Sequence, residues 1–87
     1  MTTYYYFVDS GSVDSTTSIN VARKKSVAYL EKHKNERDAP IYTGLYRPMV
    51  YGYVLRGTRN YDGYVFCNRD GMDARTIKKD GSLCKRV

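Results

Sequence analysis

The sequence predicts an α+β fold in which one amphipathic helix packs on a four- to five-stranded, mainly antiparallel sheet. Three observations support this prediction: an aromatic, strand-type run opens the chain, one later segment has helical periodicity, and the remainder alternates short Tyr- and Val-rich runs with turn residues. The chain has 87 residues. Because that length supports one modest core, we expect a single small domain covering residues 1–87.

The first expected element is a strand over Thr3 to Val8, read as TYYYFV. Aromatic and β-branched residues favour a pleated, half-buried surface. The segment from Asp9 to Thr17 is small and polar, and it contains Gly11. We therefore expect a loop there, following the first strand.

Helical periodicity predicts a helix over residues 19–34, with Ser18 or Thr17 as the N-cap. At about 100° per residue, a narrow stripe would face the sheet, while Arg23 and the other basic side chains lie mostly off it. The stripe contains Ile19, Ala22, Ser26 and Leu30. A rival interpretation extends residues 17–21 as a strand and starts the helix near Ala22.

The polar run from Asn35 to Pro40 is expected to end the helix. Five strands should follow, the first of them an edge strand or a strand interrupted at Pro48, which cannot donate a backbone hydrogen bond. The expected segments are Ile41–Tyr46, the two arms of a hairpin within Met49–Asn68, then Met72–Lys78 and Ser82–Val87.

The hairpin from Met49 to Asn68 is expected to be central in the sheet because both of its faces carry apolar or aromatic groups. In its first arm Val50, Gly52 and Val54 would share one face, and Tyr51, Tyr53 and Leu55 the other. Its loop would hold Arg56, Arg59 and Tyr61. One sheet face would lie under the helix, and the open face would be rich in tyrosine.

The charge is concentrated in the second half of the chain. Residues 1–40 hold six Lys and Arg against five Asp and Glu, whereas residues 41–87 hold nine against four. A net charge of +5 over the second half favours an anionic partner, which could be nucleic acid, an acidic protein surface or anionic lipid. A surface that is basic only for solubility would show the same skew.

The sequence shows neither a signal-peptide pattern nor an apolar run of the roughly 20 residues that a membrane span needs. We therefore expect a soluble cytoplasmic protein without a membrane partner. Cys67 and Cys84 are the only cysteines. If the strands form a simple meander, one strand separates them, which places their Cα atoms about 10 Å apart, too far for a disulfide.

The sequence lacks the residues that several kinds of catalytic, metal-binding and phosphate-binding site require. His33 is the only histidine, so neither a His-based metal set nor a Ser-His-Asp triad can be assembled. The two cysteines have no zinc-site spacing, and no glycine-rich phosphate loop is present. We expect a non-enzymatic protein without catalytic residues, metal or cofactor.

Basic residues interleaved with tyrosines are the positive evidence for binding. Such a mixture suits single-stranded nucleic acid, through base stacking and phosphate contacts, and it is equally typical of protein-interface hot spots. The candidate partner-binding residues are Tyr51, Tyr53, Arg56, Arg59, Tyr61, Tyr64, Arg69, Arg75, Lys78, Lys79, Lys85 and Arg86.

The layout of the whole chain resembles that of several small phage-encoded anti-CRISPR proteins. A short strand (TYYYFV), a polar loop, a helix with small and basic positions (INVARKKSVAYLEK) and hairpins ending in IKKDGSLCKRV carry this resemblance. Many members of that group are acidic DNA mimics, and this basic chain departs from them. The resemblance therefore implies contact with a host effector complex near its nucleic-acid path or with the guide itself, in the host cytoplasm.

Two hypotheses follow. The first is a non-enzymatic interaction protein, which could inhibit a host CRISPR-Cas effector complex through protein or guide contacts. The second is a stand-alone single-stranded nucleic-acid-binding protein that uses a Tyr/Arg sheet face. A virion or assembly component is a third class, and no residue pattern points to it.

Overall fold

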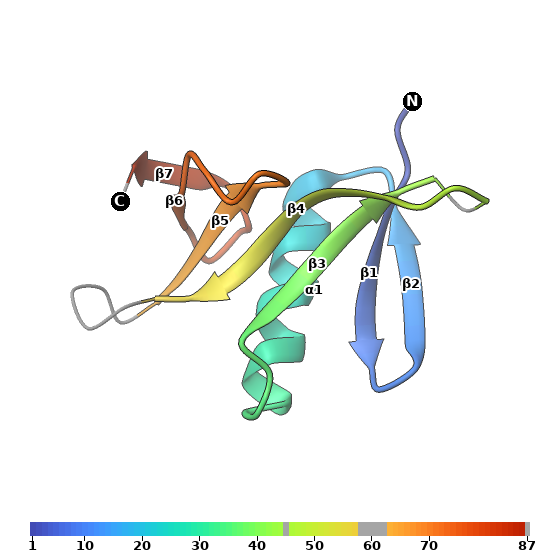
Figure 1. The fold of residues 1–87 in the computed structure, drawn as a ribbon. Coiled ribbons are helices and arrows are strands. Elements are labelled where there is room, and N and C mark those ends of the chain that lie inside the picture. The colour runs from blue at the N-terminus through green and yellow to red at the C-terminus, as the bar shows by residue number, and fades with distance from the viewer. Residues whose placement is uncertain (45, 58–62, 87) are drawn as a thin grey trace.

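The computed structural model describes residues 1–44, 46–57 and 63–86, with the backbone alone for residues 85 and 86. Its elements are β1 (Tyr4–Asp9), β2 (Ser12–Thr16), α1 (Ile19–Lys32), β3 (Asp38–Thr43), β4 (Met49–Arg56), β5 (Tyr64–Asn68), β6 (Arg75–Ile77) and β7 (Leu83–Arg86). The strands form one seven-stranded sheet in the order β2-β1-β3-β4-β5-β6-β7, with α1 packed across it (Figure 1). All neighbouring strands are antiparallel. The predicted α+β class is confirmed, with more strands than expected.

The helix starts where a good cap precedes it. Ser18 is extended, and its hydroxyl accepts a hydrogen bond from the Val21 N–H at 3.3 Å. The helix begins at Ile19, so the rival strand over residues 17–21 is wrong. It ends at Lys32, with His33 as the C-cap, two residues earlier than expected.

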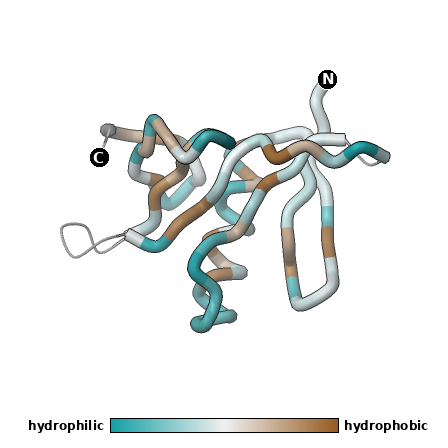
Figure 2. Tube along the Cα trace, viewed as in Figure 1, coloured by the Kyte–Doolittle hydropathy of each residue, from teal (hydrophilic) through white to brown (hydrophobic). Residues whose placement is uncertain are grey.

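The core lies between one stripe of α1 and the middle of the sheet. Ala22 and Ser26, both fully buried, bring the helix axis close to the strands. Leu30 packs there with Ile41 and Val54, which are also fully buried. Figure 2 shows the same division along the chain: hydrophobic stretches lie near the C-terminal end of β4 and in the middle of β5, and the end of the helix is hydrophilic.

The segment that was expected to be a loop contains β2. Its backbone pairs with β1 around a turn at Gly11, which has φ of 78°. Four of its five residues are exposed, so the strand is held by its ladder and has no apolar face. An edge strand of this kind has no hydrophobic alternation, which is why its sequence is typical of a loop.

The third strand also differs from the prediction. β3 begins at Asp38, inside the polar run that was assigned to the end of the helix, and it stops at Thr43. It lies between β1 and β4, so it is an inner strand, and Pro48 falls in the connection after it. β6 and β7 are shorter than the expected strands.

A β-bulge changes the facing of Tyr51. Ile41 pairs with Gly52 and Tyr42 with Val50, which leaves Tyr51 as an extra residue in β4. Tyr51 therefore turns to the helix side, where its ring centroid lies 5.1 Å from that of Tyr4. The expected grouping of Tyr51 with Tyr53 and Leu55 is wrong.

Three tyrosines lie on the sheet face away from the helix. Tyr5 pairs with Tyr42 across β1 and β3, and Tyr53 alternates with the buried Val54. Each of the three is half-buried. The expectation of a tyrosine-bearing second face therefore holds for these residues.

Both cysteines are free. Cys67 is buried in β5 and Cys84 is exposed in β7, with β6 between the two strands. The meander assumed for the distance argument is therefore present, and the predicted free thiols are confirmed. Burial raises the pKa of the Cys67 thiol, so less of the reactive thiolate forms.

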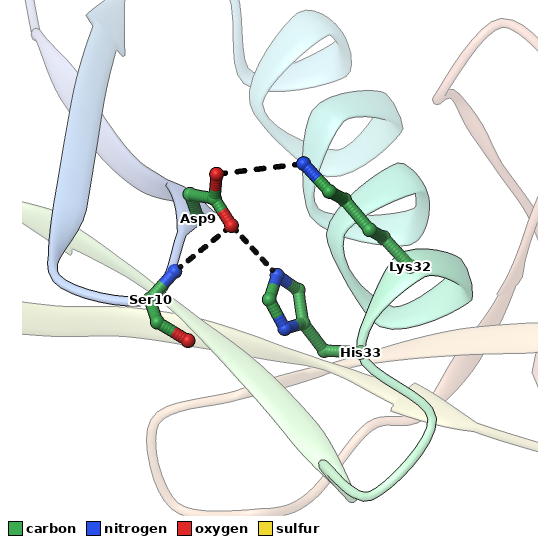
Figure 3. Close-up of polar contacts among 4 residues, drawn as sticks. All are labelled: Asp9, Ser10, Lys32 and His33. Atoms are coloured by element: carbon green, nitrogen blue, oxygen red, sulfur yellow. Dashed lines mark hydrogen bonds and ion pairs between the residues drawn. The ribbon is translucent and has the colours of Figure 1, made fainter.

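The β1–β2 turn is fastened to the end of the helix by Asp9 (Figure 3). One carboxylate oxygen of Asp9 lies 3.4 Å from Lys32 Nζ, and the other lies 3.2 Å from His33 Nε2. The same carboxylate accepts a hydrogen bond from the Ser10 N–H at 3.2 Å. These contacts join two segments that are distant in sequence.

Acid should weaken these contacts of the Asp9 carboxylate. Attraction to Lys32 and the bond from Ser10 hold the pKa of Asp9 below its ordinary value of 3.8. The ionised carboxylate therefore stabilises the fold above that value, and this contribution is lost as the pH falls through the lower folded pKa. Urea unfolding of wild type and Asp9→Asn between about pH 6 and pH 2.5 should show curves that converge at the acid end. The exposed Asp70→Asn is the control, and equal pH dependence in both variants would contradict the prediction.

In the described part of the chain, α1 is too short and too polar to cross a membrane.

Candidate binding groove

A groove of about 390 Å³ lies between α1 and the β5–β6 part of the sheet. Its apolar surface comes from Val27 and Ala28 of the helix, and from Tyr64 and Ile77 of the strands. Val27, Tyr64 and Ile77 are half-buried and pack against the core. The groove thus offers apolar contact at the margin of a rigid core.

Charged side chains surround this apolar surface. Lys24 and Glu31 come from the helix, and Lys78 and Lys79 follow β6. All four are exposed. None of the three lysines has an ion-pair partner among the residues that the structure describes. We call this site, formed by Lys24, Val27, Ala28, Glu31, Tyr64, Ile77, Lys78 and Lys79, the basic groove.

The turn that carries Lys78 and Lys79 is rigidly held. The Lys78 N–H donates to the Ser82 carbonyl at 2.8 Å, and the Gly81 N–H donates to the Lys78 carbonyl at 2.9 Å. Asp80 accepts hydrogen bonds from the Ser82 hydroxyl and N–H, which hold the pKa of its carboxyl below the ordinary value. A loop fixed in this way loses little entropy when a partner binds.

Gly81 joins this turn to the helix. Its φ is +90°, and a Cβ added there would collide with the Asn20 carbonyl oxygen. Only glycine allows this close approach. The Gly81 carbonyl in turn accepts a hydrogen bond from Arg23 Nε at 2.8 Å. The lysines therefore stand in a fixed position relative to α1.

A smaller hollow adjoins the basic groove through Gly63 and Tyr64, and Arg56 lines it. Arg56 is the last residue of β4, so its predicted position in the hairpin loop is wrong. Its guanidinium donates to the backbone carbonyls of Leu30, His33 and Glu36 and reaches the Tyr64 hydroxyl at 3.4 Å. Arg56 thus caps the C-terminal end of α1.

The other described residues proposed from the sequence lie apart from the groove. Tyr51 lies beside Arg23 and Phe66 in a separate pocket, and Tyr53 lies on the far face of the sheet. Arg69 is exposed in the turn after β5, and Arg75 is half-buried in β6, 3.9 Å from Asp73. Arg59 and Tyr61 lie outside the described residues, as do the side chains of Lys85 and Arg86.

The structure therefore brings together Tyr64, Lys78 and Lys79 from the sequence-based set and adds the helix residues that complete the groove. Sequence reasoning missed the helical half of the site. A signal was present, because Lys24, Val27, Ala28 and Glu31 follow i, i+3, i+4, i+7 spacing on one helix face. The narrow core stripe lies beside it and concealed this second face.

In the described part of the chain, no cluster of three or more His, Cys, Asp or Glu residues could hold a metal ion. Comparison of the chain with family models, curated proteins and solved structures finds no match.

Proposed function

We propose that this protein is a non-enzymatic binding protein whose basic groove receives an acidic segment of a partner protein. One observation carries this proposal: Lys24, Lys78 and Lys79 surround an apolar surface and have no ion-pair partner among the described residues. Acidic side chains would complement the lysines, and an apolar side chain of the partner would fill the space over Val27 and Ile77.

A protein segment fits the groove better than single-stranded nucleic acid does. Base stacking needs a broad exposed aromatic ring. Tyr64 is the aromatic residue of the groove, and it is half-buried with its hydroxyl 3.4 Å from Arg56. The remaining apolar surface is aliphatic, which suits leucine- or valine-type side chains. Single-stranded nucleic acid remains the alternative partner, through the arginines and tyrosines of the second half of the chain.

A narrower proposal is inhibition of a host CRISPR-Cas effector complex. It rests on the resemblance of the layout to small anti-CRISPR proteins alone. Its test is DNA cleavage by purified effector complexes with and without this protein. If the protein inhibits cleavage, replacing Lys24, Lys78 and Lys79 together by alanine should release the inhibition.

Replacing Lys24, Lys78 and Lys79 together by alanine should weaken binding of an acidic peptide roughly tenfold, since each exposed charge pair contributes about 0.2–1 kcal/mol. The probe is a fluorescent hexapeptide that alternates Asp and Glu with Leu, and anisotropy at two salt concentrations gives its affinity. A labelled poly-dT strand is titrated in parallel.

The matched control is Lys25, Lys34 and Arg37 replaced by alanine, which removes the same charge from exposed positions outside the groove. Equal weakening by both triple variants would show general charge attraction and would contradict a site in the groove. Tighter binding of poly-dT than of the peptide, with loss in the groove variant, would assign the site to nucleic acid.

A further inference from the structure

Arg23 is a buried arginine with no carboxylate within ion-pair distance among the described residues. The residue is 7% exposed and lies on the helix flank that faces the β6–β7 turn. Its Nε donates to the Gly81 carbonyl at 2.8 Å, and its Nη2 donates to Asn20 Oδ1 at 2.7 Å. Its guanidinium carbon lies 4.9 Å from the centre of the Phe66 ring. These contacts correct the expectation that Arg23 lies off the buried stripe.

Within the part of the chain that the structure describes, these contacts leave one guanidinium nitrogen without a hydrogen bond and the positive charge without a counter-ion. Nη1 makes no hydrogen bond within the described residues, and no carboxylate there lies within ion-pair distance of the guanidinium. Burial lowers the pKa of Arg23, which is the expected response of a desolvated cation without a counter-ion.

A pocket of about 290 Å³ opens beside this guanidinium. The β4 bulge places Tyr51 in its wall, 43% exposed, and Leu83 and Phe66 supply further apolar surface. Asn68 also lines the pocket. Its side-chain oxygen already accepts bonds from the Asp70 and Met72 N–H groups, so its NH₂ is left as a donor.

We propose that this pocket binds a carboxylate attached to a small apolar group. The guanidinium of Arg23 would take the carboxylate, with the Asn68 amide as a further donor, and the ring of Tyr51 and the side chain of Leu83 would contact the apolar group. Asp73, which lies 3.9 Å from Arg75, also lines the pocket, and a negative charge there disfavours a phosphate dianion more than a carboxylate. The pocket volume suits a group of the size of one amino-acid residue.

This ligand chemistry has two sources, a free organic acid or the C-terminal carboxylate of a peptide. N-acetyl-leucinate represents the first and a hexapeptide ending in leucine the second. Each has a matched neutral form, the corresponding C-terminal amide. The readout is the NMR spectrum of the isotopically labelled full chain, including the Arg23 Nε–H and Asn68 side-chain signals.

N-acetyl-leucinate should shift the signals of Arg23, Tyr51 and Asn68 with a Kd on the order of 1 mM, as its size suggests. The amide should bind at least tenfold more weakly. Tighter binding of the free-acid hexapeptide than of N-acetyl-leucinate would identify a peptide terminus as the source, and equal binding a free acid. Equal shifts with acid and amide, stronger binding of inorganic phosphate, or no shift at about 20 mM acid would each overturn the proposal.

Two variants locate the site. Tyr51→Ala removes pocket wall without touching the Arg23 hydrogen bonds, and it should weaken N-acetyl-leucinate at least threefold. Arg23→Gln should abolish binding. Since that change also breaks the link to Gly81 and could unfold the protein, it is interpreted only if its NMR spectrum stays dispersed; otherwise the wild-type titration and Tyr51→Ala decide. Unchanged affinity in Tyr51→Ala would overturn the assignment to this pocket.

Discussion

Replacing Leu30 by alanine should lower the free energy of unfolding by about 2–4 kcal/mol. Leu30 is fully buried in the interface between α1 and the sheet. It belongs to one cluster with Tyr6, Ile41, Val54 and Phe66. Truncation would remove apolar contacts and leave a cavity, because the sheet strands packed against Leu30 cannot move far enough toward the helix to fill the space.

Urea unfolding followed by circular dichroism measures this loss. Val21→Ala is the matched control, since Val21 is on the same helix and 37% exposed. It should cost less than about 0.5 kcal/mol, as surface substitutions usually do. A similar loss in both variants, or almost none for Leu30→Ala, would mean that the helix presents a different face to the sheet.

The helix and its core stripe could be predicted because their determinants are local. Ser18 lies beside the N–H groups that it caps, and Ala22, Ser26 and Leu30 repeat with the helical period. The same holds for the C-terminal meander, whose turns are marked by Asp-Gly pairs. These signals depend on residues within a few positions of one another.

What could not be predicted depends on contacts between distant segments. β2 is held by its backbone ladder to β1 and has no hydrophobic pattern of its own. The bulge at Tyr51 is a mismatch between two strands, which neither strand shows alone. The burial of Arg23 depends on Gly81, 58 residues later in the chain.

The residues of the candidate site likewise divide into those that local sequence signals could predict and those that depend on tertiary packing. Tyr64, Lys78 and Lys79 stood out as basic and aromatic residues in the second half of the chain, and they line the groove. The lysine of the helical half, Lys24, was among the basic side chains that were expected to lie mostly off the core stripe. Only the packing of α1 against β5 and β6 shows that this face and the strand residues line one space.

Replacing Arg56 by methionine should cost about 2 kcal/mol of stability, because one guanidinium donates hydrogen bonds to three carbonyls at and just beyond the end of the helix. Nη2 donates to the Leu30 carbonyl and, at 3.0 Å, to the His33 carbonyl, while Nε reaches the Glu36 carbonyl at 3.1 Å. A cation at this end also interacts favourably with the helix dipole. Methionine keeps the apolar stem of the side chain and removes both effects.

Two further variants separate hydrogen bonding from charge. Arg56→Lys restores the charge without the planar fork, so it should recover only part of the loss. Arg37→Met removes an exposed arginine that makes no hydrogen bond or ion pair within the described residues, and it should be nearly neutral. Chemical denaturation gives the stabilities, and amide hydrogen exchange near residues 30–34 shows whether the helix end frays.

The outcome also decides what Arg56 can contribute to binding. If Arg56→Met lowers stability as expected, the guanidinium is committed to the helix end, and a weaker affinity for the acidic peptide in this variant would follow from movement of α1 along the groove. If stability is unchanged but affinity falls, the carbonyls are satisfied by water and the guanidinium serves the partner. The second result would contradict the capping role and would support the sequence-based assignment of Arg56 to the binding surface.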